Sequence, residues 1–273
     1  MLRIKTMGFI GKLTVLVLGM ALVACSRPAP PPEKTGELRV GTRNSPATFF
    51  IASNGDTAGF EHDLLVAFSQ SQKWTIEWTE KSQPDMLLKL LDTQKIHLAA
   101  AALPQAVVKD NHLISGPVLF ETPVHIVVRA AEKAPRNIGA LSGKKLALIK
   151  GSGHTPMLLR LKRKNPGLSW EALENVWPEE LLAQLQAGKY DAVVINGMDF
   201  DSMRNFYPGL AVAFDIGDTQ KIVWALPRFS SYAVRNALAR FIEKSRTDGT
   251  LKRIYERYVG HVKRLDNTDI LGI

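Results

Sequence analysis

The feature that most constrains the fold is a series of apolar strand patterns that alternate with amphipathic helix patterns. Strand patterns occupy residues 37–41, 74–80 and 96–103, and helix patterns occupy residues 59–68 and 84–94 between them. The segment IHLAAAAL is almost continuously apolar, which is typical of a strand that is covered on both faces. This alternation of strands and helices predicts an α/β lobe.

A second series of the same kind follows in the remaining half of the chain. Its strand patterns lie at residues 123–130, 144–150, 190–197, 210–216 and 221–227, and its helix patterns at residues 156–166, 178–189 and 231–260. We expect the last of these helix patterns to be divided by a turn at Asp248-Gly249. Two series predict two lobes, and a chain that crosses between them near Val127 and Val223 would form a hinge beside a ligand-binding cleft.

Residues 1–24 have the pattern of a signal peptide. A start with three basic residues precedes about a dozen apolar residues, whereas a helix that crosses a bilayer needs roughly 20. The run ends in LVAC, which matches the bacterial lipoprotein box at Cys25, the only cysteine of the chain. We predict that Cys25 carries acyl chains, palmitate among them, and anchors the protein firmly to a membrane. The alternatives are a buried free thiol or a single membrane anchor.

The composition limits where the protein is expected to be located and which partners are expected to bind it. Four prolines within residues 25–36 predict an extended spacer between the lipid and the folded body. The formal net charge is +9, and three of the positive charges belong to the signal peptide. We expect a monomer on the periplasmic face of a bacterial membrane, with the outer membrane favoured because Ser26 follows the cysteine. Anionic lipid or cell-wall polymer suits this charge and place better than nucleic acid.

Five segments carry a resemblance to a known family: GELRVGT, GFEHDLLVAF, LSGKKLALIKGSG, LQAGKYDAVVI and DGTLKRIYERYVG. They resemble the landmarks of the family 3 extracellular solute-binding proteins over residues 36–261. The resemblance implies a two-lobed, periplasmic-binding-protein-like (type II) α/β fold. The first lobe would comprise residues 37–126 and 224–260, the second lobe residues 130–221, and a polar tail residues 261–273. It also implies a protein that binds a small polar solute, such as an amino acid, a peptide or a muropeptide-like compound, for transport with an ABC permease or for sensing.

Within that family, PGLAVAFDIGDTQKIVWALP and DGTLKRIYERYVGHVKRLDN most resemble the non-catalytic, solute-binding-like half of the lytic murein transglycosylase F family. Those enzymes cleave peptidoglycan with a separate lysozyme-like domain. Only 13 residues follow Gly260, and such a domain needs on the order of 100 residues. We therefore expect no catalytic residues and no enzyme activity in this chain. The alternatives are a truncated or divergent transglycosylase that acts on peptidoglycan, and an adaptor that binds another envelope protein.

The resemblance also implies positions for the residues that hold the two ends of an amino acid. A first-lobe arginine of the family binds the ligand carboxylate, and the matching position here is Lys109. A second-lobe aspartate binds the ligand ammonium, and the matching position is Asn196. A lysine lacks the planar fork of arginine, and an amide supplies no charge, so both departures weaken the case for a free α-amino acid. Alternatively, Lys109 is an exposed loop residue and Asn196 a turn residue.

A glycine loop after a strand of the second series is the strongest candidate for a binding site. It contains Gly151, Ser152, Gly153, His154 and Thr155. Glycines allow backbone N–H groups to approach a ligand, and the start of the following helix favours an anion. In the family, this loop contacts the ligand from the second lobe. The alternative is an ordinary strand-to-helix turn.

The first lobe offers four further candidates. Thr48 and Phe49 match a family loop that places an aromatic ring over the ligand, although the rings of Phe49 and Phe50 could equally belong to the core. Ala101 and Ala102 close a strand at the expected cleft and would offer backbone groups.

The six histidines show no paired ligand spacing, so we predict no metal and no cofactor. The acidic pair Glu61/Asp63 is interpreted as helix-start charge.

Overall fold

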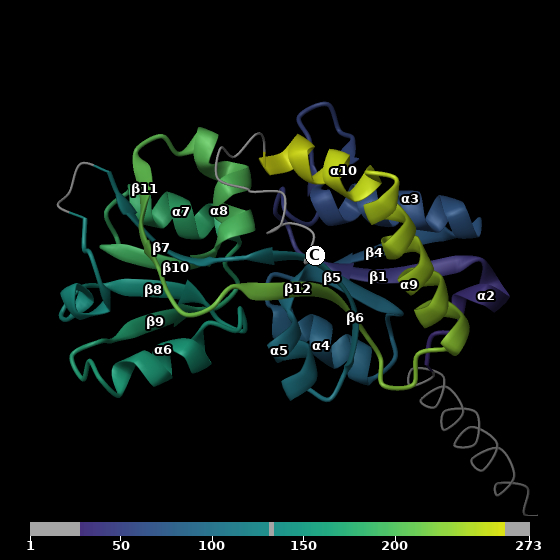
Figure 1. The fold of residues 1–273 in the computed structure, drawn as a ribbon, viewed down its shortest axis with the longest axis horizontal. Coiled ribbons are helices and arrows are strands. Elements are labelled where there is room, and N and C mark those ends of the chain that lie inside the picture. The colour runs from purple at the N-terminus through teal and green to yellow at the C-terminus, as the bar shows by residue number, and fades with distance from the viewer. Residues whose placement is uncertain (1–27, 131–133, 260–273) are drawn as a thin grey trace, which may run out of the picture.

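Two five-stranded mixed sheets, each with helices on both faces, form separate lobes that lie side by side (Figure 1). The structure is a computed structural model that describes residues 28–130 and 134–259. The predicted two-lobed fold of the α/β class is confirmed.

The sheet of the first lobe has the strand order β4-β1-β5-β12-β6. Strand β1 pairs in parallel with β4 and β5, whereas β12 pairs antiparallel with β5 and β6. Every residue of β5 is buried, as its apolar sequence predicts. The elements of this lobe are β1 (Glu37–Thr42), α3 (Phe60–Gln72), β4 (Thr75–Glu80), α4 (Pro84–Asp92), β5 (Leu98–Pro104), α5 (Gln105–Asp110), β6 (Ile114–Thr122), β12 (Gln220–Leu226), α9 (Tyr232–Thr247) and α10 (Thr250–Val259), with the small hairpin of β2 (Phe50–Ile51) and β3 (Thr57–Ala58).

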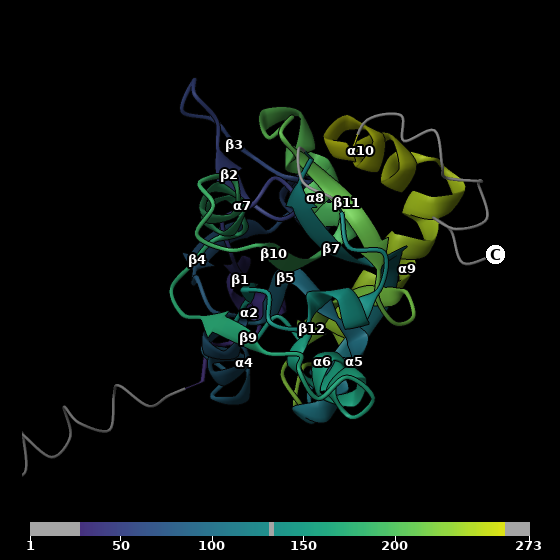
Figure 2. The same cartoon turned by 90° about the vertical axis from the view of Figure 1, so that its left-hand side faces the viewer.

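The sheet of the second lobe has the strand order β11-β7-β10-β8-β9. Figure 2 views this lobe from its own end, with α7 and α8 on one face of the sheet and α6 on the other. The elements are β7 (Val124–Arg129), the 3₁₀ helix η1 (Ile138–Leu141), β8 (Leu146–Ile149), α6 (Thr155–Lys162), β9 (Trp170–Leu173), α7 (Pro178–Gln186), β10 (Ala192–Asn196), α8 (Gly197–Met203), the 3₁₀ helix η2 (Arg204–Phe206) and β11 (Leu210–Asp215).

The chain crosses between the lobes between β6 and β7 and again between β11 and β12. Both crossings fall earlier than expected from the sequence. Strand β7 belongs to the second sheet from Val124 onward, whereas we expected the first lobe to continue to residue 126. Strand β12 belongs to the first sheet from Gln220 onward, rather than from residue 224. The apolar runs cross the lobe boundary without a break in pattern, so periodicity alone does not locate it.

The described part of the linker does not form the free spacer that its prolines predict. Ala29 N donates a hydrogen bond to Gln94 O at 2.7 Å, and His97 Nε2 lies 2.9 Å from Pro30 O. Residues Pro32–Thr35 form one helical turn, α2, with Pro32 buried. The described part of the linker therefore packs against the first lobe. Cys25 lies outside the described residues.

The part of the chain that the structure describes, residues 28–130 and 134–259, contains neither a helix that could span a membrane nor a cluster of metal ligands. There, no helix is both long enough and apolar enough to cross a membrane. The same residues contain no group of three or more His, Cys, Asp or Glu side chains that could hold a metal ion.

Candidate functional site between the lobes

Polar side chains from both lobes meet where the ends of several strands face each other. Arg43 directly follows β1, and Ala102 lies near the end of β5. From the second lobe, Asn196 ends β10 and Asp199 lies in the first turn of α8. The loop of residues 151–154 joins β8 to α6. Ligands of open α/β sheets bind outside the carboxyl ends of the strands, so this is the expected place for a site.

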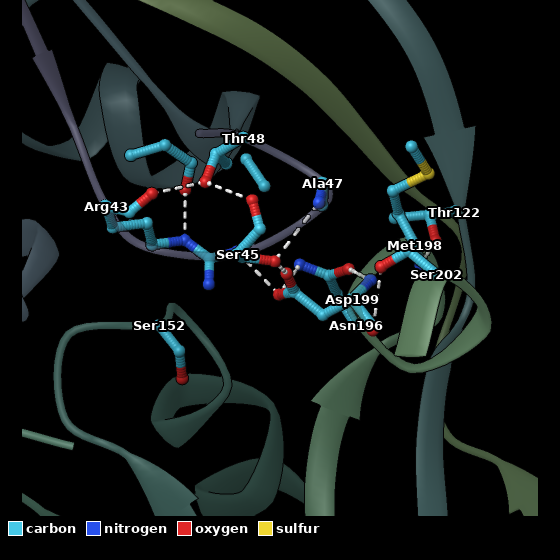
Figure 3. A network of polar contacts seen from close by, with 12 residues as sticks. Arg43, Ser45, Ala47, Thr48, Thr122, Ser152, Asn196, Met198, Asp199 and Ser202 are labelled. Atoms are coloured by element: carbon cyan, nitrogen blue, oxygen red, sulfur yellow. Dashed lines mark hydrogen bonds and ion pairs between the residues drawn. The ribbon is translucent and has the colours of Figure 1, made fainter. Parts of the chain in front are cut away.

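A buried ion pair joins the two lobes at this point (Figure 3). Arg43 Nη2 lies 2.5 Å from Asp199 Oδ2, with side-chain exposures of only 7% and 5%. Arg43 Nε also donates to Ala101 O at 2.8 Å, which fixes the guanidinium against β5. Ser45 Oγ donates to Asp199 Oδ1 at 2.7 Å, and Asn196 Nδ2 donates to Asp199 Oδ2 at 2.8 Å. The carboxylate thus accepts three hydrogen bonds, two of which come from the other lobe.

Local structure explains the position of Asp199. Asn196 is the N-cap of α8, and its side-chain Oδ1 accepts a hydrogen bond from Asp199 N at 2.9 Å. Asparagine is favoured at N-caps because its side chain satisfies an N–H group that the helix leaves unpaired. Thr122 Oγ1 accepts from Met198 N at 3.0 Å and ties the same turn to the lobe crossing. The cap therefore aims the Asp199 carboxylate across the boundary between the lobes.

Glu61 adds a buried carboxyl group beside the ion pair. Its side chain is fully buried, and both of its oxygens accept from Ala102 N, at 3.2 and 3.3 Å. Burial raises the pKa of Glu61 to about 8, so the group is protonated at neutral pH. Ala102 has a φ of 50°, a left-handed conformation that is costly for a residue other than glycine. Glu61 does lie in the first turn of α3, as the sequence predicts, but it is buried there and holds a proton instead of a charge at neutral pH.

His154 is a second buried titratable group, contributed by the second lobe. Its exposure is 3%, and burial lowers its pKa to about 4, which leaves the imidazole neutral at neutral pH. Ser152 Oγ lies 3.0 Å from His154 Nδ1. His154 Nε2 is buried and has no hydrogen-bond partner among the described residues. Buried polar atoms are usually paired, so this nitrogen indicates a place for a ligand atom.

The cavity between the lobes is small in this conformation. It has a volume of about 30 Å³ and is lined by Arg43, Ala101, Ala102, Ser152, His154, Asn196 and Asp199, among others. Since a water molecule needs roughly 10–15 Å³ by this measure, there is room for about two or three waters but not for an amino acid. The structure therefore shows the two lobes closed on each other.

The glycine loop makes this close approach feasible. A Cβ atom on Gly151 would lie 1.7 Å from Asp85 Oδ1, and one on Gly153 would lie 2.5 Å from Val107 Cγ2. Asp85 and Val107 belong to α4 and α5 of the first lobe. Both glycines also have positive φ values, of 77° and 82°. Glycine is needed here for its backbone conformation and for the contact between the lobes.

The sequence-based site residues fall into two groups. Those that line the cavity are Ala101, Ala102, Gly151, Ser152, His154 and Asn196. Those outside its lining are Thr48, Phe49, Lys109, Gly153 and Thr155.

The residues outside the lining have other surroundings. Thr48 Oγ1 donates to Arg43 O at 2.5 Å and supports the loop that carries the arginine. The ring of Phe49 is 5.1 Å from the ring of Trp78, within the first lobe. Lys109 is exposed at the end of α5. The structure therefore supplies the positive charge of the cavity from Arg43 rather than from Lys109.

Sequence reasoning missed the charged residues at the centre of the site, Arg43 and Asp199. Arg43 directly follows β1, and this place at the carboxyl end of a strand is the signal that could have indicated it. Asp199 comes three residues after Asn196, and the motif Asn-x-x-Asp at the end of a buried strand is typical of a capped helix start. That signal would have put a carboxylate beside the predicted cleft.

Comparison with known proteins places this geometry in context. The model of the bacterial extracellular solute-binding proteins, family 3, matches residues 38–261. A membrane-bound lytic murein transglycosylase F of Thiobacillus denitrificans is 72% identical over 270 residues, which are 99% of this chain and 57% of that protein. A protein of the same name from Pseudomonas putida is 34% identical over 246 residues, 88% of this chain and 48% of that protein. The chain spans about half the length of the curated relatives it matches.

Solved structures share the fold at low sequence identity. An ancestral arginine-binding protein bound to arginine superimposes with a TM-score of 0.73 at 22% identity, over 82% of this chain and 99% of that chain. The cysteine-binding protein from Campylobacter jejuni has a TM-score of 0.75 at 14% identity, over 88% of this chain and 96% of that chain. Both resemblances stated from the sequence, to the solute-binding proteins and to the transglycosylase F proteins, are confirmed.

Proposed function

The chain belongs to the bacterial extracellular solute-binding proteins of family 3, and from this membership we propose that it binds a small polar solute between its two lobes. The observation that carries the proposal is the buried pair of Arg43 and Asp199. It puts one cation and one anion on opposite lobes, at the wall of the same cavity. Glu61 and His154 are neutral at neutral pH, so these two charges dominate the site.

The proposed ligand carries complementary groups. When the lobes separate, the guanidinium of Arg43 is free to donate two parallel hydrogen bonds to a carboxylate, and Asp199 is free to bind an ammonium group. Ser45 and Asn196 would keep the aspartate oriented, and His154 Nε2 would gain a partner. An amino acid, a short peptide or a muropeptide-like compound has this pattern of charges.

The ion pair also affects how tightly such a solute binds. The ligand-free lobes are held closed by contacts that a solute must replace, because the same charged groups would bind it. Apparent affinity falls in proportion to the fraction of molecules that are in the open, binding-competent state. We therefore expect binding that is weaker than the contacts alone would give, which suits a receptor that senses a solute at high concentration.

Calorimetric titration of the protein with amino acids, short peptides and muropeptides tests the proposal. We expect at least one compound to bind the wild-type protein and to lose at least tenfold in affinity in Arg43→Ala. Arg39→Ala is the matched control, since Arg39 forms an exposed ion pair with Glu37 on the first lobe, outside the cavity. No binding by any compound, or equal loss in both variants, would contradict the proposal.

We propose further that the protein is held at the periplasmic face of a bacterial membrane, preferentially the outer membrane, by acyl chains on Cys25. The support is the sequence pattern and the family, whose members are extracellular. Mass spectrometry of the protein purified from membranes should show cleavage before Cys25 and the added mass of a diacylglycerol and an acyl chain. Cys25→Ser should abolish both changes and release the protein from the membrane fraction.

A second candidate function rests on the 72% identity to a transglycosylase F that the chain matches over only part of its length. The chain would then be the solute-binding-like part of a protein that acts on peptidoglycan. Glu61 is a buried, protonated carboxyl, the type of group that glycan cleavage needs. However, it is fully buried and does not line the cavity, and the cavity is too small for a sugar ring.

Incubation with purified peptidoglycan separates the two functions. We expect the protein to release no anhydro-muropeptides, because the buried Glu61 carboxyl has no access to a glycan. Release that disappears in Glu61→Gln would favour the transglycosylase, whereas solute binding without release favours the receptor.

A further inference from the structure

One end of the first lobe carries two exposed aromatic rings beside the start of the described chain. Phe229, in the loop between β12 and α9, is 76% exposed, and Tyr232, in the first turn of α9, is 72% exposed. Their neighbours Leu226 and Val234 are buried in the core, so the loop is anchored while the two rings point outward. We infer that this end of the lobe docks on an anionic phospholipid membrane, an inference that rests on the proposed lipid on Cys25.

The N-terminal linker brings the anchor close to these rings. Ala29 and Pro30 are hydrogen-bonded to the first lobe through Gln94 and His97. A hollow in the surface is lined by Ala29, Pro31, Pro32, Ile96, Phe229, Ser231 and Val234, among others, so the linker and the aromatic loop are direct neighbours. Figure 1 shows the same arrangement, with the start of the described chain next to the loop that leads into α9.

The length of the tether limits the distance to the membrane. Cys25 precedes Pro28 by three residues, which span at most about 10 Å when fully extended. A lipid on Cys25 therefore brings the headgroup region to within about 10 Å of the packed linker. Aromatic side chains with one apolar and one polar side are enriched at this level of a membrane.

The charge of the same surface suits anionic lipid. Arg228 and Arg235 flank the two rings in sequence, and both are exposed. Within the part of the chain that the structure describes, neither guanidinium has a hydrogen-bond or ion-pair partner. Residues 227–241 contain three arginines and no carboxylate. Basic residues close to an anionic leaflet are attracted to it, so these residues would orient a lobe that the lipid already holds nearby.

Docking in this way would leave the binding cleft accessible. The aromatic surface lies at the far end of the first lobe, and the second lobe lies at the opposite end of the long axis (Figure 1). The first lobe would be fixed to the membrane while the second lobe remained free to open and close.

Spin labelling of the lipid-modified full chain in vesicles tests the inference. Cys25 is the only cysteine and its thiol carries the lipid, so a cysteine introduced elsewhere can be labelled selectively. Ala233→Cys places the label next to Tyr232, and Ala172→Cys places it on the exposed face of β9 in the second lobe as a matched control. In phosphatidylglycerol-containing vesicles, we expect the label at 233 to be at least fivefold less accessible to an aqueous nickel relaxation agent than the label at 172.

Two further variants distinguish the contribution of the aromatic side chains to membrane contact from the contribution of the lipid tether. The double variant Phe229→Ser/Tyr232→Ser should remove the protection at position 233, whereas Phe206→Ser, which replaces a ring that is 78% exposed on the second lobe, should leave it unchanged. Equal accessibility at 233 and 172 in a lipid-modified protein would overturn the docking surface alone. A protein whose mass shows no lipid would overturn the anchor and the docking surface together, and neither result would affect the solute titration.

Discussion

Arg43 and Asp199 are 156 positions apart in the sequence and belong to different lobes, yet their charged groups are 2.5 Å apart in a buried ion pair. A buried pair is costly to desolvate, and its removal from one side leaves an uncompensated charge. The closed state of the lobes therefore depends on both residues, and so does the proposed binding of a solute with opposite charges.

Removal of one partner should open the lobes. Asp199→Ala leaves the Arg43 guanidinium buried without a carboxylate, and opening of the cleft would return it to water. We expect a larger radius of gyration by small-angle X-ray scattering and a free energy of unfolding lower by about 3 kcal/mol, the low end of the range for a broken buried pair. The matched control is Glu37→Ala, which removes the exposed ion-pair partner of Arg39 and should leave the unfolding free energy and the radius nearly unchanged.

Replacement of both partners should restore closure. The double variant Arg43→Met/Asp199→Leu has apolar groups at both positions and no buried charge to rehydrate, so we expect a radius of gyration near that of the wild type. In a double-mutant cycle with Arg43→Met and Asp199→Leu, the double variant should lose less unfolding free energy than the sum of the two single losses, by at least about 1 kcal/mol. Additive effects would show that the two residues act independently, contrary to the structure.

Gly153→Ala should prevent full closure by steric contact. The new Cβ atom would lie 2.5 Å from Cγ2 of Val107, a branched side chain of the other lobe that has little freedom to turn away. Gly143→Ala is a matched control in the same lobe, because Gly143 has a similar φ of 73° and nothing within 4 Å of an added Cβ. Both variants should lose about 1 kcal/mol of stability from the strained backbone. Only Gly153→Ala should increase the radius of gyration, and an unchanged radius would show that the loop yields instead.

Glu61 should make stability depend on pH above neutrality. Its pKa is about 8 in the folded protein and near 4.5 in an unfolded chain, so the folded state holds a proton that the unfolded state releases. This contribution is complete below pH 4.5 and is lost as the pH rises through 8. Between pH 6.5 and 8, the free energy of unfolding should fall by up to about 1.4 kcal/mol per pH unit. Glu61→Gln should remove this slope in urea denaturation curves.

His154 gives the opposite dependence and defines the window for that measurement. Its pKa is about 4 in the folded protein and near 6.5 when unfolded, so its contribution is complete above pH 6.5 and is lost as the pH falls through 4. Between pH 4.5 and 6.5, a rise in pH lowers the free energy of unfolding through Glu61 and raises it through His154. His154→Gln should leave the slope of the unfolding free energy above pH 6.5 unchanged. If the slope disappears in this variant, the titrating group is His154 and not Glu61.

Lys109→Ala should not change solute affinity. The family position suggested a ligand contact, but Lys109 is exposed at the end of α5 and does not line the cavity. We expect affinities within twofold of the wild type by calorimetry, compared with at least a tenfold loss in Arg43→Ala. A large loss in Lys109→Ala would mean that the open state brings this lysine to the ligand.

The sequence was sufficient to predict the fold because its signals are local. The buried runs of β5 and β10 and the glycine loop after β8 show their structure in a few consecutive residues. The elements that were missed have weaker signals. Strand β9 has the burial pattern of a half-exposed edge, and α8 is a short helix that begins within the motif Asn-Gly-Met-Asp.

The centre of the site was harder to predict, because it depends on contacts between distant residues. Nothing adjacent to Arg43 indicates that its partner is Asp199, and only the closure of two lobes brings them together. Glu61 appears in the sequence as one of two acidic residues at a helix start, but Glu61 is fully buried whereas Asp63 pairs with Arg257 on the surface. Burial of this kind follows from the tertiary structure and not from the residue type.

The measurement that tests the central claim most directly is a distance between the lobes during solute titration. A pair of fluorophores, one on each lobe, reports opening and closure in single molecules. We predict a closed ligand-free wild type, an open Asp199→Ala variant, and a solute that the wild type binds in a closed state while the variant does not bind it. An Asp199→Ala variant that stays closed and binds the same solute with unchanged affinity would contradict the account.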